Sequence, residues 1–418
     1  MKYIKRDVEE KLLSLLEAFP CLVLTGPRQT GKSTLLTHLL PGYRYATLDD
    51  PLLREQALSD PRFFLDSLGE RAIIDEIQYA PGLLSYVKII VDSNRDKRGL
   101  FVFTGSQQFA MIRNLGETLA GRIALLELLP FGIGEKKRAL DLPDTLSAFT
   151  HAALTGSYPE PALYPMADTH AWYASYLQTY LERDIRTIYN IGNLRDFQRF
   201  LQLLAARCAQ QLNLSEYSRQ LGVSMPTVKN WLSILEASRI VYLLPPYHAN
   251  LGKRIVKAPK LYFLDIGLVA HMTGIRDPEI LLRGPLAGPL FENFCIQETV
   301  KIFLHSGERP PLFYLRTAAG LEVDLLVERS LGKVVPVEIK LNKTLSASLA
   351  SSLTRFTKAF SQFTVQEAIL LSLADGTVPL TREVKAVSLD DYLAGLKSSP
   401  RISSISRSRP VTRTSRGP

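Results

Sequence analysis

Short apolar runs alternate with amphipathic stretches between residues 20 and 130. Five runs, CLVLTG, YRYATLD, RAIIDE, LFVFTGS and IALLELLP, have the length and composition of strands, and most stretches between them have the period of helices. Strands that alternate with helices form parallel sheets covered on both faces. The pattern therefore predicts an α/β domain over residues 1–135.

The pattern changes four times after this domain. Residues 136–200 contain several prolines and then stretches with the period of a helix, which predicts a helical lid or linker. Residues 201–255 contain two helices separated by Gly222 and followed by the apolar run RIVYLLPPY, which predicts a winged helix-turn-helix. Residues 256–396 mix strands and helices again. Residues 397–418 have six basic residues, no acidic residue and little to bury, which predicts a disordered basic tail.

The composition is ordinary for a globular protein of several domains. The 418 residues are 46% hydrophobic and 22% charged, and no run approaches the roughly 20 apolar residues that span a bilayer. We therefore expect a cytoplasmic protein without membrane contact. The cysteines Cys21, Cys208 and Cys295 lie far apart and form no CxxC pair, so we expect buried free thiols and no disulfide framework or zinc site.

One glycine-rich stretch carries a phosphate-binding motif. Residues 26–33, GPRQTGKS, match GxxxxGK[ST] at every fixed position, after a predicted strand and before a predicted helix. Backbone N–H groups of such a loop face phosphate oxygens, the lysine reaches the β- and γ-phosphates, and the serine hydroxyl binds Mg²⁺. We expect ATP and Mg²⁺ as cofactors. The predicted ATP-binding residues here are Gly26, Pro27, Arg28, Gln29, Thr30, Gly31, Lys32, Ser33 and Thr34.

Two acids end the strand RAIIDE. In a P-loop ATPase the aspartate at this strand end holds the magnesium ion, and an adjacent glutamate polarises the attacking water. We therefore expect Asp75 to bind Mg²⁺ together with Ser33, and Glu76 to act in catalysis.

Two further elements could complete this site. The strand LFVFTGS ends in Thr104 and Ser106, and we expect Ser106 first, or else Thr104, to sense the γ-phosphate. The alternative role of this hydroxyl is a helix cap. Arg122 precedes the fifth strand and could reach a nucleotide of this chain or of a neighbouring chain in an oligomer. Both Arg122 and Arg28 could instead be surface salt-bridge partners.

The predicted helix-turn-helix offers a surface for DNA. Its second helix would present Ser224, Thr227, Lys229 and Asn230 to a groove, and the net charge of +9 favours nucleic-acid contact. Only Lys229 is basic on this helix, however, and winged helices also contact proteins. DNA and a partner protein therefore both stay open as partners.

The stretch GLEVDLLVERSLGKVVPVEIK suggests a third chemistry. Asp324 lies on one predicted strand, and Glu338 and Lys340 end the next; side chains two residues apart on a strand share a face. Two carboxylates on adjacent strands can bind a divalent cation, and a lysine can orient water. Glu292, on an otherwise apolar helix, adds an acid. We expect these four residues to form one pocket with Asp324 and Glu338 as metal ligands. In the alternative, Lys340 pairs with a carboxylate in an inactive remnant.

The whole layout resembles bacterial and archaeal AAA-type ATPases with a C-terminal domain of unknown function of PD-(D/E)xK restriction-endonuclease-like fold. The resemblance covers Tyr3 to about residue 375 and rests on LTGPRQTGKST, AIIDEIQ, FTGS, LAGRIALLELLPF, TGSYPEP, YLERDI, LYFLDIGL, GPLFENF, GLEVDLLV and VPVEIK. It implies a P-loop NTPase sheet, a winged helix-turn-helix and an α/β restriction-endonuclease-like domain.

Two functions follow from these features. In the first, ATP hydrolysis is coupled to a DNA-directed, nuclease-like module. In the second, the chain is a nucleotide-dependent switch whose C-terminal domains only bind DNA or a partner protein, without cleavage.

Overall fold

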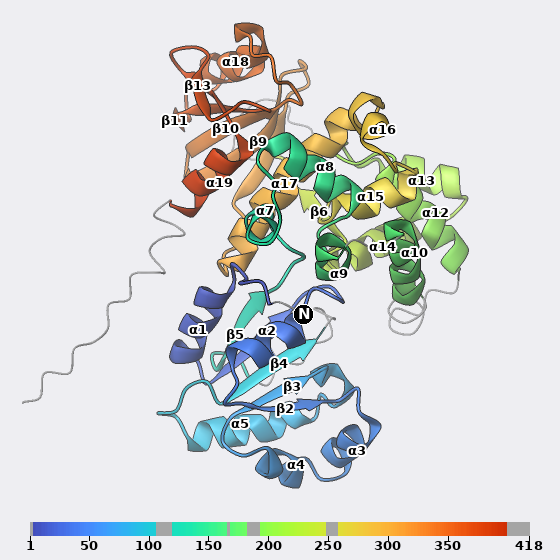
Figure 1. The fold of residues 1–418 in the computed structure, drawn as a ribbon, viewed down its shortest axis with the longest axis vertical. Coiled ribbons are helices and arrows are strands. Elements are labelled where there is room, and N and C mark those ends of the chain that lie inside the picture. The colour runs from blue at the N-terminus through green and yellow to red at the C-terminus, as the bar shows by residue number, and fades with distance from the viewer. Residues whose placement is uncertain (1–2, 106–118, 165–167, 182–192, 248–257, 399–418) are drawn as a thin grey trace, which may run out of the picture.

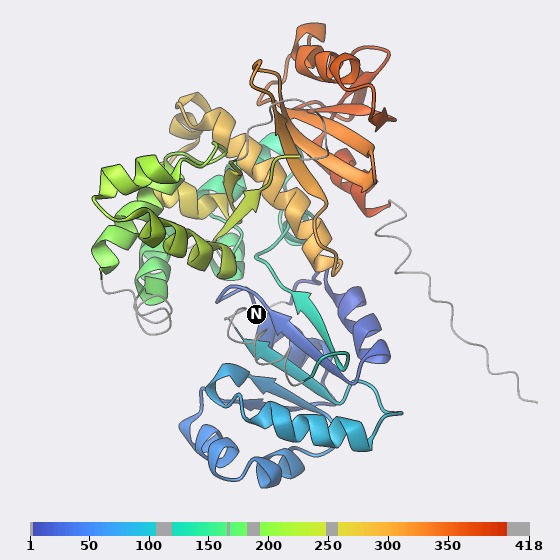
Figure 2. The same ribbon diagram turned by 180° about the vertical axis from the view of Figure 1, so that it is seen from behind.

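The computed structural model describes residues 3–105, 119–164, 168–181, 193–247 and 258–398. Ser106 and the tail beyond residue 398 therefore lie outside the described residues. An N-terminal α/β domain forms one end of the molecule, and a helical middle unit and a C-terminal sheet domain lie side by side at the other end (Figures 1 and 2). None of the described helices is long and apolar enough to cross a membrane.

The N-terminal domain is built on a five-stranded sheet with the order β2-β3-β4-β1-β5, in which every pair is parallel. Strand β4 lies between the strand before the P-loop and the strand that ends in Asp75. The five predicted strands are confirmed as β1 (Cys21–Thr25), β2 (Arg44–Thr47), β3 (Ala72–Asp75), β4 (Phe101–Gly105) and β5 (Ile123–Glu127).

Helices cover both faces of this sheet, as predicted. Side chains of β1 alternate between two apolar clusters, because Cys21 and Val23 pack on one face and Leu22 and Leu24 on the other. The second of these faces is covered by α1 (Glu9–Ala18) and α2 (Lys32–Leu39), and the first by α3 (Pro51–Ser59), α4 (Pro61–Leu68) and α5 (Leu83–Ser93). A short 3-10 helix, η1 (Ile77–Tyr79), follows β3.

The middle unit contains two helices joined by a tight turn. Gly222 ends the first helix with a left-handed φ of 68°, and Ser224 caps the second by accepting a hydrogen bond from the backbone N–H of Thr227. The helices of this unit are α7 (Ile133–Lys137), α8 (Thr145–Leu154), α9 (Pro159–Leu163), α10 (Thr169–Thr179), α12 (Leu194–Ala205), α13 (Leu214–Leu221), α14 (Met225–Ala237), α15 (Ile266–Thr273) and α16 (Pro278–Arg283).

A two-stranded hairpin follows the helix-turn-helix. Strand β6 (Val241–Leu244) pairs antiparallel with β7 (Lys260–Phe263). The expected domain boundary at residue 256 therefore falls inside this hairpin, and β7 belongs with β6 and not with the C-terminal sheet. The two helices, the turn and the hairpin are present, and the assignment to the winged-helix class stays a prediction.

The C-terminal domain is a mixed sheet of the order β13-β14-β12-β10-β9-β8, with β11 paired to β10. The two predicted strands are β9 and β10. The elements are α17 (Ala287–His305), β8 (Leu312–Arg316), β9 (Glu322–Ser330), β10 (Lys333–Ile339), η3 (Ala347–Ala350), α18 (Ser351–Ala359), β11 (Thr364–Val365), β12 (Ala368–Leu371), β13 (Thr377–Pro379), β14 (Val384–Val387) and α19 (Leu389–Lys397).

The last helix reaches further than the sequence indicates. Lys397, taken as the first residue of a disordered tail, instead ends α19. Its ammonium group lies 2.7 Å from Oδ2 of Asp7, next to α1. The expected tail start at residue 397 is therefore wrong, because Lys397 is the last residue of α19.

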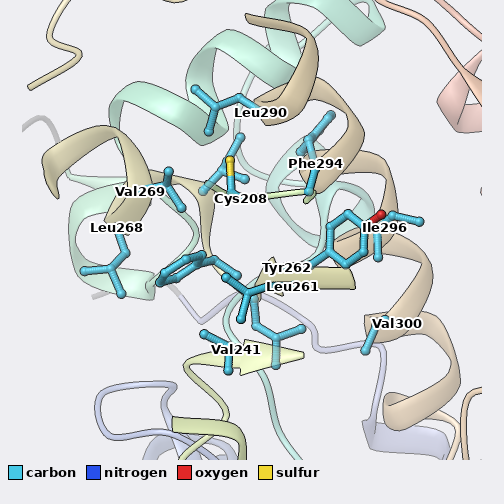
Figure 3. Close-up of a cluster of buried hydrophobic side chains, with 14 of the residues drawn as sticks. Cys208, Val241, Leu261, Tyr262, Leu268, Val269, Leu290, Phe294, Ile296 and Val300 are labelled. Carbon is cyan, nitrogen blue, oxygen red and sulfur yellow. The ribbon is translucent and has the colours of Figure 1, made fainter. Parts of the chain in front are cut away.

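The middle unit and the C-terminal domain share one apolar core. Figure 3 shows β7 residues Leu261 and Tyr262 beside Phe294 and Ile296 of α17, with Cys208 in the same cluster. All three cysteines of the chain are buried and free, as expected. This packing fixes β7 against α17, so that the polar end of β7 is placed beside the C-terminal sheet.

Candidate nucleotide site and carboxylate pocket

The loop between β1 and α2 has the backbone of a phosphate-binding loop. Gly26 has φ 142°, and a Cβ atom there would lie 2.0 Å from the carbonyl oxygen of Leu128. Only glycine fits such an approach. Gly31, with φ 86°, caps α2, whose first N–H groups have no intrahelical partner and can bind an anion.

Lys32 lies over this loop. It is 7% exposed, and its ammonium donates to the carbonyl oxygens of Gly26 and Pro27 at 2.9 and 2.8 Å. Arg6 supports the loop from outside, because its guanidinium donates to the carbonyl oxygen of Thr30 at 2.8 Å and to Glu135 at 2.9 Å. Sequence reasoning missed Arg6, since no local motif marks it.

Asp75 lies directly opposite Ser33. The Ser33 hydroxyl donates to Oδ2 of Asp75 at 2.8 Å, and the Tyr45 hydroxyl donates to the same oxygen at 2.5 Å. Burial, and then the hydrogen bond to Asp75 and its charge, raise the pKa of Tyr45 to about 12. A serine hydroxyl and a carboxylate are hard oxygen donors of the kind that Mg²⁺ prefers, so this pair fits the ion. Tyr45 is a further contact that the sequence did not reveal.

Glu76 follows Asp75 in a left-handed conformation, with φ 59° and ψ 45°. Few non-glycine residues adopt this region, and residues held in it cluster at functional sites. The Glu76 backbone N–H donates to Thr104 Oγ1 at 3.3 Å, and the Gln78 amide donates to the Glu76 carboxylate. Burial raises the pKa of Glu76, and the charge of Lys32 opposes this shift. The glutamate thus lies beside the lysine of the P-loop.

Thr104 takes the place between the two motifs. The Thr104 hydroxyl donates to Oδ1 of Asp75, and its Oγ1 accepts a hydrogen bond from the backbone N–H of Glu76. This is the second of the two hydroxyls expected at the end of β4. The first, Ser106, lies outside the described residues.

Arg122 lies at the end of the strands opposite to the P-loop. It precedes β5, and its carbonyl oxygen accepts from the N–H of Cys21 at the start of β1. The P-loop follows the far end of β1, about 16 Å away for a strand of this length. Arg122 pairs with Asp92 at 2.7 Å. The prediction that it reaches a nucleotide of its own chain is therefore wrong, and contact with a neighbouring chain stays a prediction.

The P-loop opens into a pocket of about 320 Å³ with walls from two units. Residues of the P-loop region and Glu76 form one wall. Tyr176 and Thr179 of α10, with the following Tyr180, form the other. Arg28, Gln29 and Thr34 also line this space, which agrees with their expected place beside a nucleotide.

The predicted carboxylates converge at the C-terminal sheet. Leu325 lies opposite Val337, so Asp324 and Glu338 lie opposite each other on one face of β9 and β10. Lys340 Nζ lies 2.7 Å from Glu338 Oε1 and 3.8 Å from Asp324 Oδ2. The backbone N–H of Ile339 donates to the same Asp324 oxygen at 3.0 Å.

A lysine that sequence reasoning missed lies among these acids. Lys260, the first residue of β7, has a side chain that is 4% exposed. Its Nζ lies 3.1 Å from Glu292 Oε1, 2.8 Å from Glu322 Oε1 and 3.5 Å from Asp324 Oδ1. A lysine next to the apolar run LYFL could have drawn attention, because a buried ammonium needs partners.

The electrostatics of this pocket follow from burial and crowding. Burial and the charge of Asp324 raise the pKa of Glu292 to about 7, against the opposing charge of Lys260. Burial and Asp324 also raise the pKa of Glu338. In the described part of the chain, no group of three or more His, Cys, Asp or Glu residues is placed to hold a metal ion. The four predicted residues meet, but as arranged they do not fit a divalent cation.

Three family descriptions match successive parts of the chain. Residues 18–136 match an AAA domain, residues 146–279 a domain of unknown function (DUF8612), and residues 287–392 another domain of unknown function (DUF4143). Their borders agree with the N-terminal domain, the middle unit and the C-terminal domain of the structure. The second match includes β7, in agreement with its pairing to β6.

Two solved structures are similar to this chain at low identity. One is the Walker-type ATPase PABY2304 of Pyrococcus abyssi, with a TM-score of 0.44, 16% identity, and coverage of 65% of this chain and 96% of that chain. The other is the ORC1 protein of Aeropyrum pernix in complex with DNA, with a TM-score of 0.30, 14% identity, and coverage of 65% and 93%.

Two mycobacterial relatives match nearly the whole chain. The uncharacterized proteins Rv2008c of Mycobacterium tuberculosis and Mb2031c of Mycobacterium bovis are each 30% identical over 400 residues. The match covers 94% of this chain and 87% of each relative. With its AAA domain and its P-loop geometry, the chain is thus an AAA-type P-loop ATPase, and it belongs to the family of these two mycobacterial proteins.

Proposed function

We propose that the chain is an ATP-hydrolysing switch, in which the nucleotide bound at the P-loop sets how the middle unit lies on the N-terminal domain. The observation that carries this proposal is the pocket whose walls come from both units. A nucleotide there contacts the P-loop and lies against the Tyr176–Tyr180 end of α10. Binding and hydrolysis then change the free energy of that interface, because a ligand shifts an equilibrium through its differential contacts.

The chemistry would use side chains already in place. Lys32 exchanges the carbonyl oxygens of Gly26 and Pro27 for the β- and γ-phosphate oxygens. Ser33 and Asp75 hold Mg²⁺, which neutralises phosphate charge when bound. Glu76 polarises the attacking water, and its raised pKa makes it a stronger base than an ordinary carboxylate.

Two side-chain contacts connect this site to the helix-turn-helix. The Tyr180 hydroxyl donates to Oγ of Ser238, which ends α14, at 3.0 Å. The adjacent Arg239 pairs with both oxygens of Glu127 at 2.6 Å. Glu127 lies opposite Thr25, the residue before the P-loop. The end of α14 is therefore fixed to strand ends that carry the nucleotide site.

The helix-turn-helix is the surface through which the switch would act. Lys229 and Asn230 are exposed on α14, and Ser224 and Thr227 lie at its start. The net charge of +9 favours DNA as the partner. Salt-sensitive DNA binding would support this choice, and no binding at low salt would leave a partner protein as the occupant.

DNA cleavage by the C-terminal domain is the second candidate. The convergence of Asp324, Glu338 and Lys340 favours it, and the position of Lys260 opposes it. We therefore expect no nicking of plasmid DNA by the wild-type protein with Mg²⁺ or Mn²⁺. Nicking that is lost in both Asp324→Ala and Lys340→Ala would instead establish the nuclease.

ATP turnover tests the nucleotide site itself. Lys32→Ala should weaken nucleotide binding, because it removes a positive charge from the phosphates. Glu76→Gln should bind ATP normally but turn it over at least about a hundredfold more slowly, since only activation of the water is lost. The matched control is Glu70→Gln, an exposed carboxylate paired with Lys97, which should have the wild-type rate. Wild-type turnover by Glu76→Gln would contradict the proposed role.

A further inference from the structure

A groove of about 960 Å³ lies where the three units meet (Figure 2). The N-terminal domain contributes β5, and the middle unit contributes the end of α14 and β6. The C-terminal domain contributes the end of α17, the loop that follows it, and the start of β8. A ligand in this groove would therefore contact all three units at once.

The groove has an excess of acidic side chains, although the chain as a whole has a net charge of +9. Its lining contains four acids, Glu127, Glu236, Glu308 and Glu328, and two bases, Arg239 and Arg309. Glu127 and Arg239 pair with each other, so three acids remain against one base. Within the described part of the chain, neither Glu236 nor Glu308 has an ion-pair partner. Burial raises the pKa of Glu236 against the charge of Arg239, so a further positive charge would favour its ionised form.

The other walls of the groove are apolar and fixed in shape. They include four prolines, Pro245, Pro259, Pro310 and Pro311, and the rings of Tyr242 and Phe313. Proline fixes φ and has no N–H group, so these walls keep their form without a ligand. Leu125 of β5 is 42% exposed, and no strand of the described residues pairs with the outer edge of β5. An open strand edge beside rigid apolar walls favours an extended segment with basic and small apolar side chains.

A segment with these side chains begins close to the groove. Residues 399–418, which follow the described part of the chain, are SPRISSISRSRPVTRTSRGP, with five arginines, two isoleucines, one valine and no acidic residue. The ion pair between Lys397 and Asp7 fixes the place where this segment starts. Lys11, about one helical turn beyond Asp7, lies against Gly307 of the groove. The start is thus within roughly 25 Å of the groove, and about eight extended residues cover this distance.

We propose that the groove is the docking site of the chain's own residues 399–418. Their arginines lie beside Glu236 and Glu308, and their small apolar side chains lie against the proline walls. A docked segment stabilises the arrangement of the three units, because it contacts each of them. Arginines held in the groove are not available to phosphate, so the groove and DNA compete for the same residues. The proposal does not depend on ATP hydrolysis.

A fluorescently labelled synthetic peptide of residues 399–418 tests this docking. We expect it to bind, at low salt and as measured by fluorescence anisotropy, to a protein truncated after Ser398, which retains every described helix and strand. The full-length protein should bind the peptide at least about tenfold more weakly. The reason is that its own C-terminal segment is tethered near the groove and has a high effective concentration there.

Substitutions in the groove test where the segment lies. In the truncated protein, Glu236→Gln combined with Glu308→Lys should weaken peptide binding at least about tenfold, because both remove attraction for arginine. Glu55→Lys combined with Asp66→Asn makes the same change of charge on exposed residues of α3 and α4, and it should leave binding unchanged. In full-length protein, trypsin should cleave after the arginines of residues 399–418 faster when the two groove substitutions are present.

Each of three results would overturn the proposal. The first is no binding of the peptide to the truncated protein at low salt. The second is binding that the two groove substitutions leave unchanged, which would show that the segment binds elsewhere. The third is equal binding by the truncated and full-length proteins, which would show a groove that takes a basic peptide of a partner and not its own C-terminal residues.

Discussion

Thr104 is a single hydroxyl in contact with both acids of the nucleotide site. It donates to the carboxylate of Asp75 and accepts the backbone N–H of Glu76. We expect Thr104→Val to slow ATP turnover by about ten- to a hundredfold with little loss of nucleotide affinity, because both acids lose their orientation. Steady-state kinetics and nucleotide titration measure the two effects. Thr273→Val, at a half-buried helix position, is the control, and an equal loss there would contradict a specific role.

His305 makes stability depend on pH. Burial lowers its pKa to about 4, although the charge of Glu135 opposes the shift, and its Nε2 accepts the N–H of Leu129 at 3.1 Å. The unfolded chain binds the proton near pH 6.5, so the stabilisation is complete above that pH and is lost as the pH falls towards 4. We expect protonation of His305 to lower the free energy of unfolding by up to about 3 kcal/mol over this pH range.

Thermal unfolding between pH 4.5 and 7 measures this dependence. In His305→Gln the amide oxygen can still accept from Leu129, but no proton is taken up, so the variant should lose less stability on acidification than the wild type. The difference between the two proteins isolates His305, since His151 and Glu292 also titrate in this range in both. Parallel pH profiles would show that His305 contributes nothing.

Some residues of the two sites could be predicted from the sequence, and others could not. Ser33 and Asp75 were predictable, because each lies at a fixed place relative to a strand end. Arg6 and Lys260 were not, because each acts on residues that are far away along the chain. Arg122 was misplaced for a related reason: the pattern locates the strand, but the parallel sheet decides which of its ends faces the nucleotide.

Helix α10 carries a tryptophan close to the nucleotide pocket, so its fluorescence can report nucleotide binding. The chain has two tryptophans, and both belong to the middle unit: Trp172 on α10, stacked on Tyr176, and Trp231 on α14. The N-terminal domain has none. We therefore expect ATP to change tryptophan emission although it binds at the P-loop, because Tyr176 lines the same pocket.

Single-tryptophan proteins assign the response. Trp231→Phe retains the signal of Trp172, and Trp172→Phe retains that of Trp231. A change at Trp231 would show that the nucleotide acts as far as the helix-turn-helix, and Tyr180→Phe should reduce that change by removing the bond to Ser238. If emission does not change in any protein that binds ATP, the two units are not coupled through α10.

The pair between β5 and the end of α14 is a second connection. Arg239 has a left-handed φ of 57°, and its side chain and that of Glu127 are 20% and 11% exposed. We expect Arg239→Ala and Glu127→Gln each to destabilise the protein by about 1–3 kcal/mol, because each leaves a mostly buried charge without its partner. In thermal unfolding, the double variant should lose less stability than the sum of the losses in the two single variants. Strict additivity would show that the pair contributes no coupling.

Most elements were visible in the sequence because their signals are local. Apolar period and end caps identify β1 to β5, both helices of the helix-turn-helix, and β9 with β10. Strand β7 was assigned to the wrong unit, because its pairing with β6 is a tertiary fact that no local period encodes. The convergence of Asp324 and Glu338 was predictable from alternation, whereas the ammonium among them comes from another unit.

The whole molecule carries its excess positive charge unevenly. Residues 399–418 contain five arginines and no acidic residue. DNA affinity falls as salt concentration rises, because binding releases counterions. We expect removal of these residues to make this dependence shallower, reducing the magnitude of the slope of log affinity against log salt concentration by up to about 4–5. The truncation must keep Lys397, since it pairs with Asp7. An unchanged slope in equilibrium binding at several salt concentrations would show that the tail does not contact phosphate.

The ion pair between Asp7 and Lys397 has a consequence for biosynthesis. Its two residues are 390 positions apart, so a ribosome that adds roughly 5–20 residues per second makes the second about 20 to 80 s after the first. The buried backbone N–H groups of Leu129 and Ile133 donate to the side chains of His305 and Glu298 of α17, which are also made later than the N-terminal domain. The N-terminal domain can therefore form its P-loop early, but the contacts that join it to the rest of the chain form only after residue 397 has been made.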